Sequence, residues 1–248
     1  MKIFDSHFHI INPKYPIFEN NGYVPPNFLI EDYQKKIKNL NIVGGAIVSG
    51  SFQKFDQDYL VNSLKALGKD YFGVANIPVN INKKTLNKLY DSNIRAVRFN
   101  LKRGGSETID NMVYLSNKLF NEYGWHTEIY VDSKELKELK NTLIKLPFFS
   151  IDHLGLSKVG LKELYHWAEK GIKIKATGFG RLNFNPIEIM KEIYKINPES
   201  LMFGTDLPST RANEKYSNKH LEIIKNNFSD IALNKILYKN AKNLYNKN

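Results

Sequence analysis

The chain has 248 residues, of which 42% are hydrophobic and 12% aromatic, a composition typical of a folded protein long enough to build one large core. It contains no cysteine, which excludes disulfides, thiolate metal ligands and a cysteine nucleophile. The formal net charge is +11, but the lysines are scattered over helical patterns and interleaved with Glu and Asn. We therefore expect no nucleic-acid partner, because no cluster combines basic residues with stacking aromatic side chains.

The first strand pattern begins at Lys2, so the sequence predicts no signal peptide. No apolar run approaches the roughly 20 residues that a membrane span requires. We therefore expect a cytoplasmic protein with no membrane partner. The sequence leaves the oligomeric state open.

Eight segments in chain order have the short apolar or alternating pattern of a β-strand, and a helical pattern follows each one. These segments are residues 3–9, 43–49, 71–77, 94–100, 125–131, 149–153, 172–177 and 201–206. Helix starts are marked by Asn82, Asp132-Ser133, Asn185-Pro186 and Asn240, before the helical patterns 83–91, 134–146, 187–196 and 241–245. The alternation, with no GxGxxG turn after any strand, predicts one domain, residues 1–248, folded as an α/β protein, a (β/α)8 TIM barrel.

Three connections that follow strands are longer than usual, at residues 10–28, 101–110 and 207–217. A barrel of this kind binds its ligands at the carboxyl ends of its strands. These three loops therefore indicate the mouth of the barrel and the binding surface around it.

Two histidines stand at the end of the first predicted strand, in the segment KIFDSHFHI that begins at Lys2. Because the side-chain period of a strand is two, Asp5, His7 and His9 should share one face, with the two imidazoles converging at the mouth. Such a pair can hold a metal ion, a water molecule or a substrate oxygen. Two hydrogen-bonded interior histidines without a ligand are the alternative interpretation.

Polar side chains also stand at the carboxyl ends of the other strands, and they predict a polar pocket on an apolar scaffold. They are Ser49, Ser51, Arg98, Asn100, Tyr130, His153, Thr177, Arg181 and Asp206. Closure of the barrel would bring Asp206 beside the first strand. His126 lies about 13 Å below Tyr130 by strand rise, so it is excluded from this site.

Lys175 alternates with apolar residues and should point into the barrel. A structural ion pair with Asp5, Glu128 or Asp152 is the favoured interpretation. Arginine is rare in this chain, since only five of the 36 basic residues are Arg. Four of them stand at, or just after, the carboxyl end of a predicted strand, namely Arg98, Arg103, Arg181 and Arg211. The planar donor fork of arginine suits carboxylate or phosphate, so an acidic substrate is expected.

Six segments together resemble the amidohydrolase superfamily, and more closely its branch that resembles 2-pyrone-4,6-dicarboxylate lactonase. The segments are DSHFH at 5–9, AVRFN at 96–100, GWHTEIY at 124–130, IDHLG at 151–155, ATGFGRL at 176–182 and FGTDLP at 203–208. The resemblance implies a hydrolase acting on a small carboxylate-bearing or sugar-acid lactone. It further implies Asp206 as the general base for water attack, and His7, His9 and His153 as the groups that polarise the carbonyl.

The same resemblance implies that Arg98, Arg103 and Arg181 bind substrate carboxylates, with Tyr130, Ser49 and Ser51 near other substrate contacts. His7, His9 and Asp206, with His153 nearby, could hold one divalent metal ion, most naturally zinc. Metal-binding members usually carry further ligands on the fourth and fifth strands, where this chain has Arg98 and Tyr130. The sequence therefore leaves open whether the enzyme requires a metal ion. The alternatives are a metal-dependent decarboxylase, a TatD-like phosphoesterase and a barrel that binds its ligand without catalysis.

Overall fold

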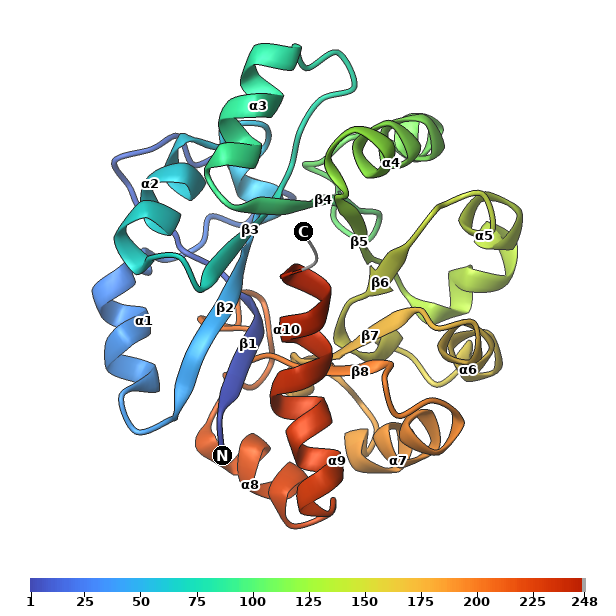
Figure 1. Ribbon diagram of the computed structural model, residues 1–248. Helices are drawn as coiled ribbons and strands as arrows, with labels where there is room; N and C mark the ends of the chain where they lie inside the picture. Colours follow the sequence, from blue (N-terminus) through green and yellow to red (C-terminus); the bar gives the residue numbers. More distant parts are fainter. Residues whose placement is uncertain (247–248) are drawn as a thin grey trace.

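The computed structural model describes residues 1–246 as eight parallel strands in a ring, surrounded by helices (Figure 1). Residues 247–248 of the predicted domain lie outside this description. The strands are β1 (Ile3–Phe8), β2 (Ile42–Val48), β3 (Tyr71–Ala75), β4 (Ile94–Asn100), β5 (His126–Tyr130), β6 (Phe149–Ile151), β7 (Lys173–Ala176) and β8 (Leu201–Phe203). They are paired in sequence order, which confirms the predicted (β/α)8 barrel.

One helix follows each of the first seven strands and packs on the outside of the ring. These helices are α1 (Ile30–Ile37), α2 (Asp58–Leu67), α3 (Lys83–Asp91), α4 (Ile109–Tyr123), α5 (Leu136–Leu143), α6 (Leu161–Glu169) and α7 (Pro186–Ile196). The predicted caps of α3 and α7 are confirmed, since the side chains of Asn82 and Asn185 accept hydrogen bonds from backbone N–H groups of the first turn. The helix predicted at 134–146 is shorter in the structure. A 3-10 turn at Ser133–Glu135 comes first, and α5 begins at Leu136 and ends at Leu143. No helix among the described residues is long and apolar enough to cross a membrane.

After β8 the chain forms α8 (Asn218–Lys225), α9 (Asp230–Asn234) and α10 (Asn240–Tyr245). A π-helical turn at Lys235–Lys239 joins α9 to α10 without a break. The predicted helix 241–245 is present as α10, but Asn240 does not cap it, because the backbone is helical on both sides of this residue. Its side chain instead donates hydrogen bonds to the carbonyls of Pro198 and Leu201, which ties α10 to the strand that precedes it.

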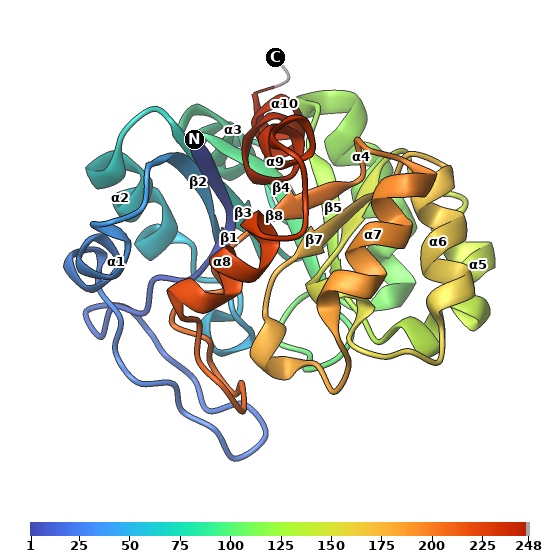
Figure 2. The ribbon, with the colours of Figure 1, turned by 90° about the horizontal axis from the view of Figure 1, so that it is seen from below.

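The two ends of the barrel differ in what covers them. Figure 2 shows α9 and α10 at the end where β1 begins, while the long loops extend from the opposite end. Tyr245 of α10 enters the ring and stacks on Phe4 at a centroid distance of 5.5 Å. The amino-terminal end is thus filled by an apolar plug, which leaves the carboxyl-terminal end as the open mouth.

The ring closes between β8 and β1 through two backbone hydrogen bonds. Asp206 N donates to His7 O at 2.7 Å, and His9 N donates to Leu207 O at 2.8 Å. Gly204 permits this approach, because a Cβ at that position would lie 2.7 Å from His7 N. Closure therefore brings Asp206 beside the histidines of β1, although they lie at opposite ends of the sequence.

A β-bulge interrupts the alternation of β1. Asp5 pairs with Gly45 and Phe8 pairs with Ile47, so three steps along β1 correspond to two along β2. The extra residue changes which side chains face the barrel interior beyond this point.

Asp5 faces the surrounding helices instead of the mouth. Its carboxylate accepts hydrogen bonds from the Tyr33 hydroxyl of α1 at 3.1 Å and from Thr205 Oγ1 at 2.7 Å. His7 and His9 both point into the mouth, where each lies 3.8 Å from Asp206. The prediction that Asp5 shares their face is wrong, because a period of two holds only where the strand has no bulge.

Seven of the eight predicted strands end earlier than expected, and the early ends of β6 and β8 orient two site residues. β6 stops before His153 and β8 stops before Asp206. Both residues have a left-handed backbone, with φ of 52° and 58°. Non-glycine residues adopt this conformation rarely, and it often marks functional positions where the surrounding structure over-determines the backbone.

Candidate active site

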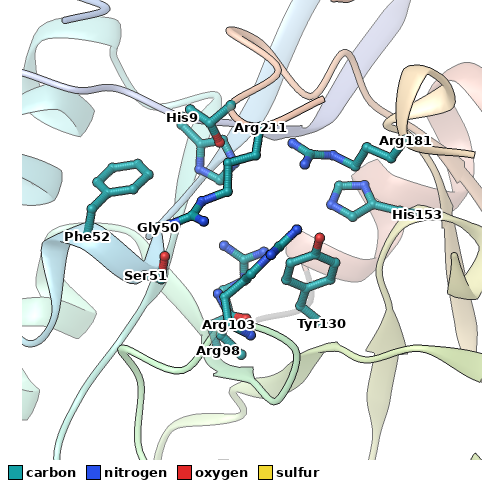
Figure 3. Close-up of a pocket in the computed structure, with 12 residues that line it drawn as sticks. His9, Gly50, Ser51, Phe52, Arg98, Arg103, Tyr130, His153, Arg181 and Arg211 are labelled. Atoms are coloured by element: carbon teal, nitrogen blue, oxygen red, sulfur yellow. Dashed lines mark hydrogen bonds between the residues drawn. The ribbon is translucent and has the colours of Figure 1, made fainter. Parts of the chain in front are cut away.

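A small polar pocket lies at the carboxyl ends of the strands (Figure 3). All four arginines that follow strands line it, whereas Arg95, at the start of β4, does not. The pocket is lined by His9, Gly50, Ser51, Phe52, Arg98, Asn100, Arg103, Tyr130, His153, Arg181, Thr210 and Arg211. Two of the three long loops supply Arg103, Thr210 and Arg211, in agreement with the prediction that these loops surround the mouth.

At the base of this pocket, His7, His9 and Asp206 form what we call the mouth cluster. The Nε2 atoms of His7 and His9 each lie 3.8 Å from Asp206 Oδ1. Within residues 1–246, His7 Nε2 and Asp206 Oδ1 are buried without a hydrogen-bond partner. Buried polar atoms are rarely left unpaired, so these atoms face the position of a water molecule, an ion or a substrate oxygen.

Hydrogen bonds behind the rings orient two of the histidines. His9 Nδ1 donates to the carbonyl of Val48 at 2.6 Å, which leaves the Nε2 lone pair directed at the pocket. His153 Nδ1 is hydrogen-bonded to Thr177 Oγ1 at 2.7 Å. Burial and nearby cations lower the pKa of His9 to about 3 and that of His153 well below its usual range. Both rings are therefore neutral near pH 7.

His7 has the same electrostatic character but is fully buried behind the pocket, as is Asp206, and neither residue lines it. Its Nδ1 is 3.4 Å from both Asp152 Oδ1 and Lys175 Nζ. Burial is the largest influence that lowers the pKa of His7 well below its usual range, and Lys175 is the next. The pocket base thus contains three neutral imidazoles, since the ring of His153 is 4.9 Å from that of His7.

Asp206 is held by one of the arginines expected to bind substrate. Arg181 Nε donates to Asp206 Oδ2 at 2.8 Å, and Arg181 Nη2 forms an ion pair with the same oxygen at 2.8 Å. Burial raises the pKa of Asp206 more than the attraction of Arg181 lowers it. The carboxylate therefore has one oxygen fixed by the guanidinium and one oxygen, Oδ1, free to accept a proton or bind a ligand.

Arg98 also has a partner inside the protein. Its Nη2 donates to Asp152 Oδ2 at 2.9 Å, and its Nη1 donates to the carbonyl of Ser49 at 2.5 Å. Burial raises the pKa of Asp152, but Arg98 and Lys175 outweigh burial and lower it overall, so this carboxylate is ionised at neutral pH. Arg98 lines the pocket and also neutralises this buried carboxylate.

Below the site, the ion pair expected for Lys175 is present. Lys175 Nζ lies 2.5 Å from Glu128 Oε2, and the hydroxyl of Tyr245 donates to the other oxygen of the same carboxylate. Burial acts to raise the pKa of Glu128, but Lys175 outweighs it and lowers the value to about 2. His126 lies beside Glu128 at 3.1 Å and does not line the pocket, in agreement with its exclusion from the site.

The remaining predicted substrate contacts are placed as follows. Tyr130, Ser51 and Arg103 line the pocket. Ser49 does not, because its hydroxyl donates to Gln57 Oε1 at 2.8 Å, away from the mouth. That prediction is corrected: Ser49 contributes its carbonyl, which holds Arg98.

Three residues of the site were missed by the reasoning from sequence. Arg211 was noted as an arginine after a strand, yet it was not assigned to the site. Asp152 was considered only as a partner for Lys175. Asn20 carried no signal, since it is one asparagine in a long loop, and its contacts with Arg211 and Arg103 depend on how three loops meet.

The mouth cluster has the donor set of a divalent-metal site. One ligand atom from each of His7, His9 and Asp206 lies within 4.8 Å of the others, and His7, Asp152 and His153 form a second such group. Two imidazole nitrogens and a carboxylate oxygen suit zinc. The unpartnered Nε2 of His7 and Oδ1 of Asp206 agree with this, so the residues fit a metal ion.

A barrel with paired histidines on β1 and an aspartate after β8 belongs to a known class. The family model described as Amidohydrolase matches residues 4–247, so this chain belongs to the amidohydrolase family, as predicted. Two of its curated relatives are named as hydrolases. It is 27% identical over 156 residues to 2-pyrone-4,6-dicarboxylate hydrolase of Comamonas testosteroni, covering 61% of this chain and 51% of that enzyme. It is 23% identical to 4-sulfomuconolactone hydrolase of Hydrogenophaga intermedia over 229 residues, 82% of this chain and 74% of that enzyme.

The chain thus spans about half the length of the Comamonas enzyme. Among solved structures it resembles a probable 2-pyrone-4,6-dicarboxylic acid hydrolase of Acinetobacter baumannii, which was crystallised with citric acid. The TM-score is 0.84 with 20% identity, over 100% of both chains. This likeness shows the shared fold.

Proposed function

We propose that this protein hydrolyses the ring ester of a small lactone that carries anionic groups. The observation that carries the proposal is Asp206 Oδ1, a buried carboxylate oxygen that has no hydrogen-bond partner among residues 1–246. It lies 3.8 Å from two neutral imidazoles, next to a pocket lined by four arginines. The names of the two curated relatives, both lactone hydrolases, support the reaction class.

In the proposed mechanism, Asp206 acts as the general base. Arg181 fixes Oδ2, so Oδ1 is the oxygen that takes a proton from the attacking water. A positioned base of this kind contributes roughly 10²–10⁴-fold to the rate. The raised pKa of Asp206 makes it a stronger base than a solvent-exposed aspartate.

His153 is suited to the carbonyl oxygen of the substrate. When Thr177 donates its hydroxyl hydrogen to Nδ1, the proton of the neutral ring resides on Nε2 and can be donated to the developing oxyanion. Collapse of the tetrahedral intermediate breaks the ring C–O bond, and the leaving oxygen takes the proton from Asp206. The new carboxylic acid ionises, so each turnover releases one proton at neutral pH.

If a divalent metal ion is bound, His7, His9 and Asp206 would hold it, and zinc is the metal their donor set favours. Such an ion would polarise the substrate carbonyl and acidify a bound water. The steps above use the residues of this chain and do not depend on it. A cytoplasmic location and the absence of a nucleic-acid partner stay predictions.

The substrate should carry more than one anionic group. Arg98 and Arg181 are each engaged with a buried carboxylate, whereas Arg103 and Arg211 line the outer part of the pocket. Arginine forks bind carboxylates with two parallel hydrogen bonds, so these two can hold substituents distant from the ring ester.

A substrate panel tests the proposal. Purified protein is supplied with lactones that carry no, one or two carboxylates, including 2-pyrone-4,6-dicarboxylate, and proton release is followed with a pH indicator. We expect kcat/KM to increase with the number of carboxylates. Absence of turnover on every lactone, or release of carbon dioxide from an aromatic acid without ring opening, would reject it in favour of a binding protein or a decarboxylase.

A further inference from the structure

Residues 10–28, which we call the β1 loop, extend beyond the strand ends beside the loop that follows β8, as Figure 2 shows for the blue and orange loops. The β1 loop is anchored at its base by the paired backbones of Ile11 and Phe28. Near its tip, Asn20 pairs with Tyr23 through backbone hydrogen bonds of 3.0 and 3.2 Å. These contacts give the loop a defined shape and fix the position of the Asn20 side chain.

The half-buried side chain of Asn20 connects three other loops of the mouth. Its Oδ1 accepts from Ser51 Oγ at 3.0 Å and from Arg211 Nη2 at 3.1 Å. Its Nδ2 donates to the carbonyl of Arg103 at 3.0 Å. Arg211 Nη2 also donates to the backbone carbonyl of Asn20, and its guanidinium lies 4.4 Å from the ring centroid of Tyr23.

The loop that carries Arg103 is held against the same point. Gly105 has φ of +77°, and a Cβ there would lie 2.1 Å from the carbonyl oxygen of Ser51. The loop after β4 therefore packs directly on the residue that donates to Asn20. Small displacements at Asn20 should be transmitted to both arginines, because neither loop has room to adjust independently.

The charges of these two arginines are not balanced by the protein. Arg98 and Arg181 pair with Asp152 and Asp206, but among residues 1–246 neither Arg103 nor Arg211 has a carboxylate within ion-pair distance. Arg103 Nε is buried without a hydrogen-bond partner. Burial, and then the like charge of Arg103, lower the pKa of Arg211 from its usual value. Two cations held together in this way should bind an anion supplied from outside the protein.

We propose that Asn20 is a positioning residue that holds Arg103 and Arg211 together as the receptor for the second anionic group of the substrate. This inference rests on the proposed function for the identity of the substrate, but its binding step can be measured without hydrolysis. Asn20 then determines specificity between substrates with one and with two anionic groups. It touches neither the reacting atoms nor the mouth cluster.

The test uses isophthalate, an aromatic ring with two carboxylates, and benzoate, with one, as ligands that cannot be hydrolysed. Their dissociation constants are measured by calorimetry for the wild type and for Asn20→Ala. We expect Asn20→Ala to weaken isophthalate about tenfold, the factor that corresponds to about 1.4 kcal/mol. Benzoate should change by less than about twofold, as for a substitution away from its binding groups.

Two further variants make the comparison specific. Asn27→Ala alters an exposed asparagine of the same loop and should leave both constants unchanged. Asn20→Asp retains the acceptor for Arg211 but removes the donor to Arg103 and adds a negative charge. Asn20→Asp should also lower the affinity for isophthalate selectively. If Asn20→Ala lowers the melting temperature, the affinities of Asn20→Asp are used for the comparison instead.

The outcomes separate this inference from the proposed function. Selective loss of isophthalate in the Asn20 variants supports the inference even if no lactone is hydrolysed, a result that would reject the proposed function alone. Equal affinities in wild type and Asn20 variants, or equal losses for both ligands, overturn the inference. If Asn20→Ala hydrolyses a dicarboxylate lactone with an unchanged KM, the inference about Asn20 is also overturned, but the proposed hydrolase function is retained. If the wild type binds no dicarboxylate and hydrolyses no lactone, both fail.

Discussion

Replacement of Asp206 by asparagine tests the centre of the proposed mechanism. Arg181 donates from Nε to Oδ2 and places Nη2 against the same oxygen, so the amide oxygen of the substituted side chain should take that position and its amide nitrogen should occupy the place of Oδ1. The group 3.8 Å from both imidazole Nε2 atoms then becomes a hydrogen-bond donor that cannot accept a proton. Loss of a general base costs roughly 10²–10⁴-fold in kcat, or about 3–5 kcal/mol in the barrier.

The assay is proton release on a dicarboxylate lactone, with kcat and KM measured separately. We expect KM to change little, because the four pocket arginines are retained. In the wild type, kcat/KM should decrease as pH falls and Asp206 becomes protonated, at a pH above 3.8 because burial raises its pKa. This acid limb should disappear in Asp206→Asn. The exposed Asp110→Asn on α4 serves as the control. A kcat for Asp206→Asn within tenfold of the wild type would refute Asp206 as the base.

Three further predictions concern the metal, the outer arginines and the buried ion pair. Three buried carboxylates around the site are matched by three buried cations, so the mouth cluster should bind a divalent ion weakly. We therefore expect turnover to survive treatment with a chelator. A decrease of about 100-fold in kcat that added zinc restores would indicate metal catalysis instead. Arg103→Lys should raise KM for a dicarboxylate substrate about tenfold with little effect on kcat, because lysine lacks the planar donor fork of arginine. Steady-state kinetics measure both constants. An unchanged KM would exclude Arg103 from substrate binding. Lys175→Met should cost roughly 3–5 kcal/mol in the free energy of unfolding at pH 7, since it removes the cation that pairs with the buried carboxylate of Glu128. The pKa of Glu128 is lowered to about 2, so its stabilising contribution is present above about pH 4.5 and is lost as pH falls towards 2. The difference in melting temperature between wild type and variant should therefore narrow in acid, and an equal difference at pH 7 and pH 3 would contradict this account.

The strands and the family could be read from the sequence because their signals are local. Apolar runs bounded by turn residues predicted all eight strands, and β4 has the predicted bounds. His7, His9, His153 and Asp206 were expected at the mouth, and the barrel brings them together there. The position of a residue relative to a strand end decides which end of a barrel it occupies, and that position is visible in sequence.

The errors arose where local periodicity is interrupted. Asp5 was expected beside the histidines, but one extra residue in β1 turns it toward Tyr33. A bulge depends on the register between neighbouring strands, which one strand's sequence does not contain. Asn240 was expected to cap a new helix, but a π-helical turn continues the preceding helix into α10.

The barrel, its mouth and the residue types gathered there follow from the order of residues along the chain. Which of those residues pair with one another depends on how the chain folds. Arg98 and Arg181 were equivalent to Arg103 as substrate ligands in the sequence, yet the fold gives the first two buried carboxylate partners and gives Arg103 none among residues 1–246. Asn20 became part of the site only through contacts with residues 31, 83 and 191 positions away. Such contacts depend on how distant loops meet in space, and no periodic pattern along the chain records them.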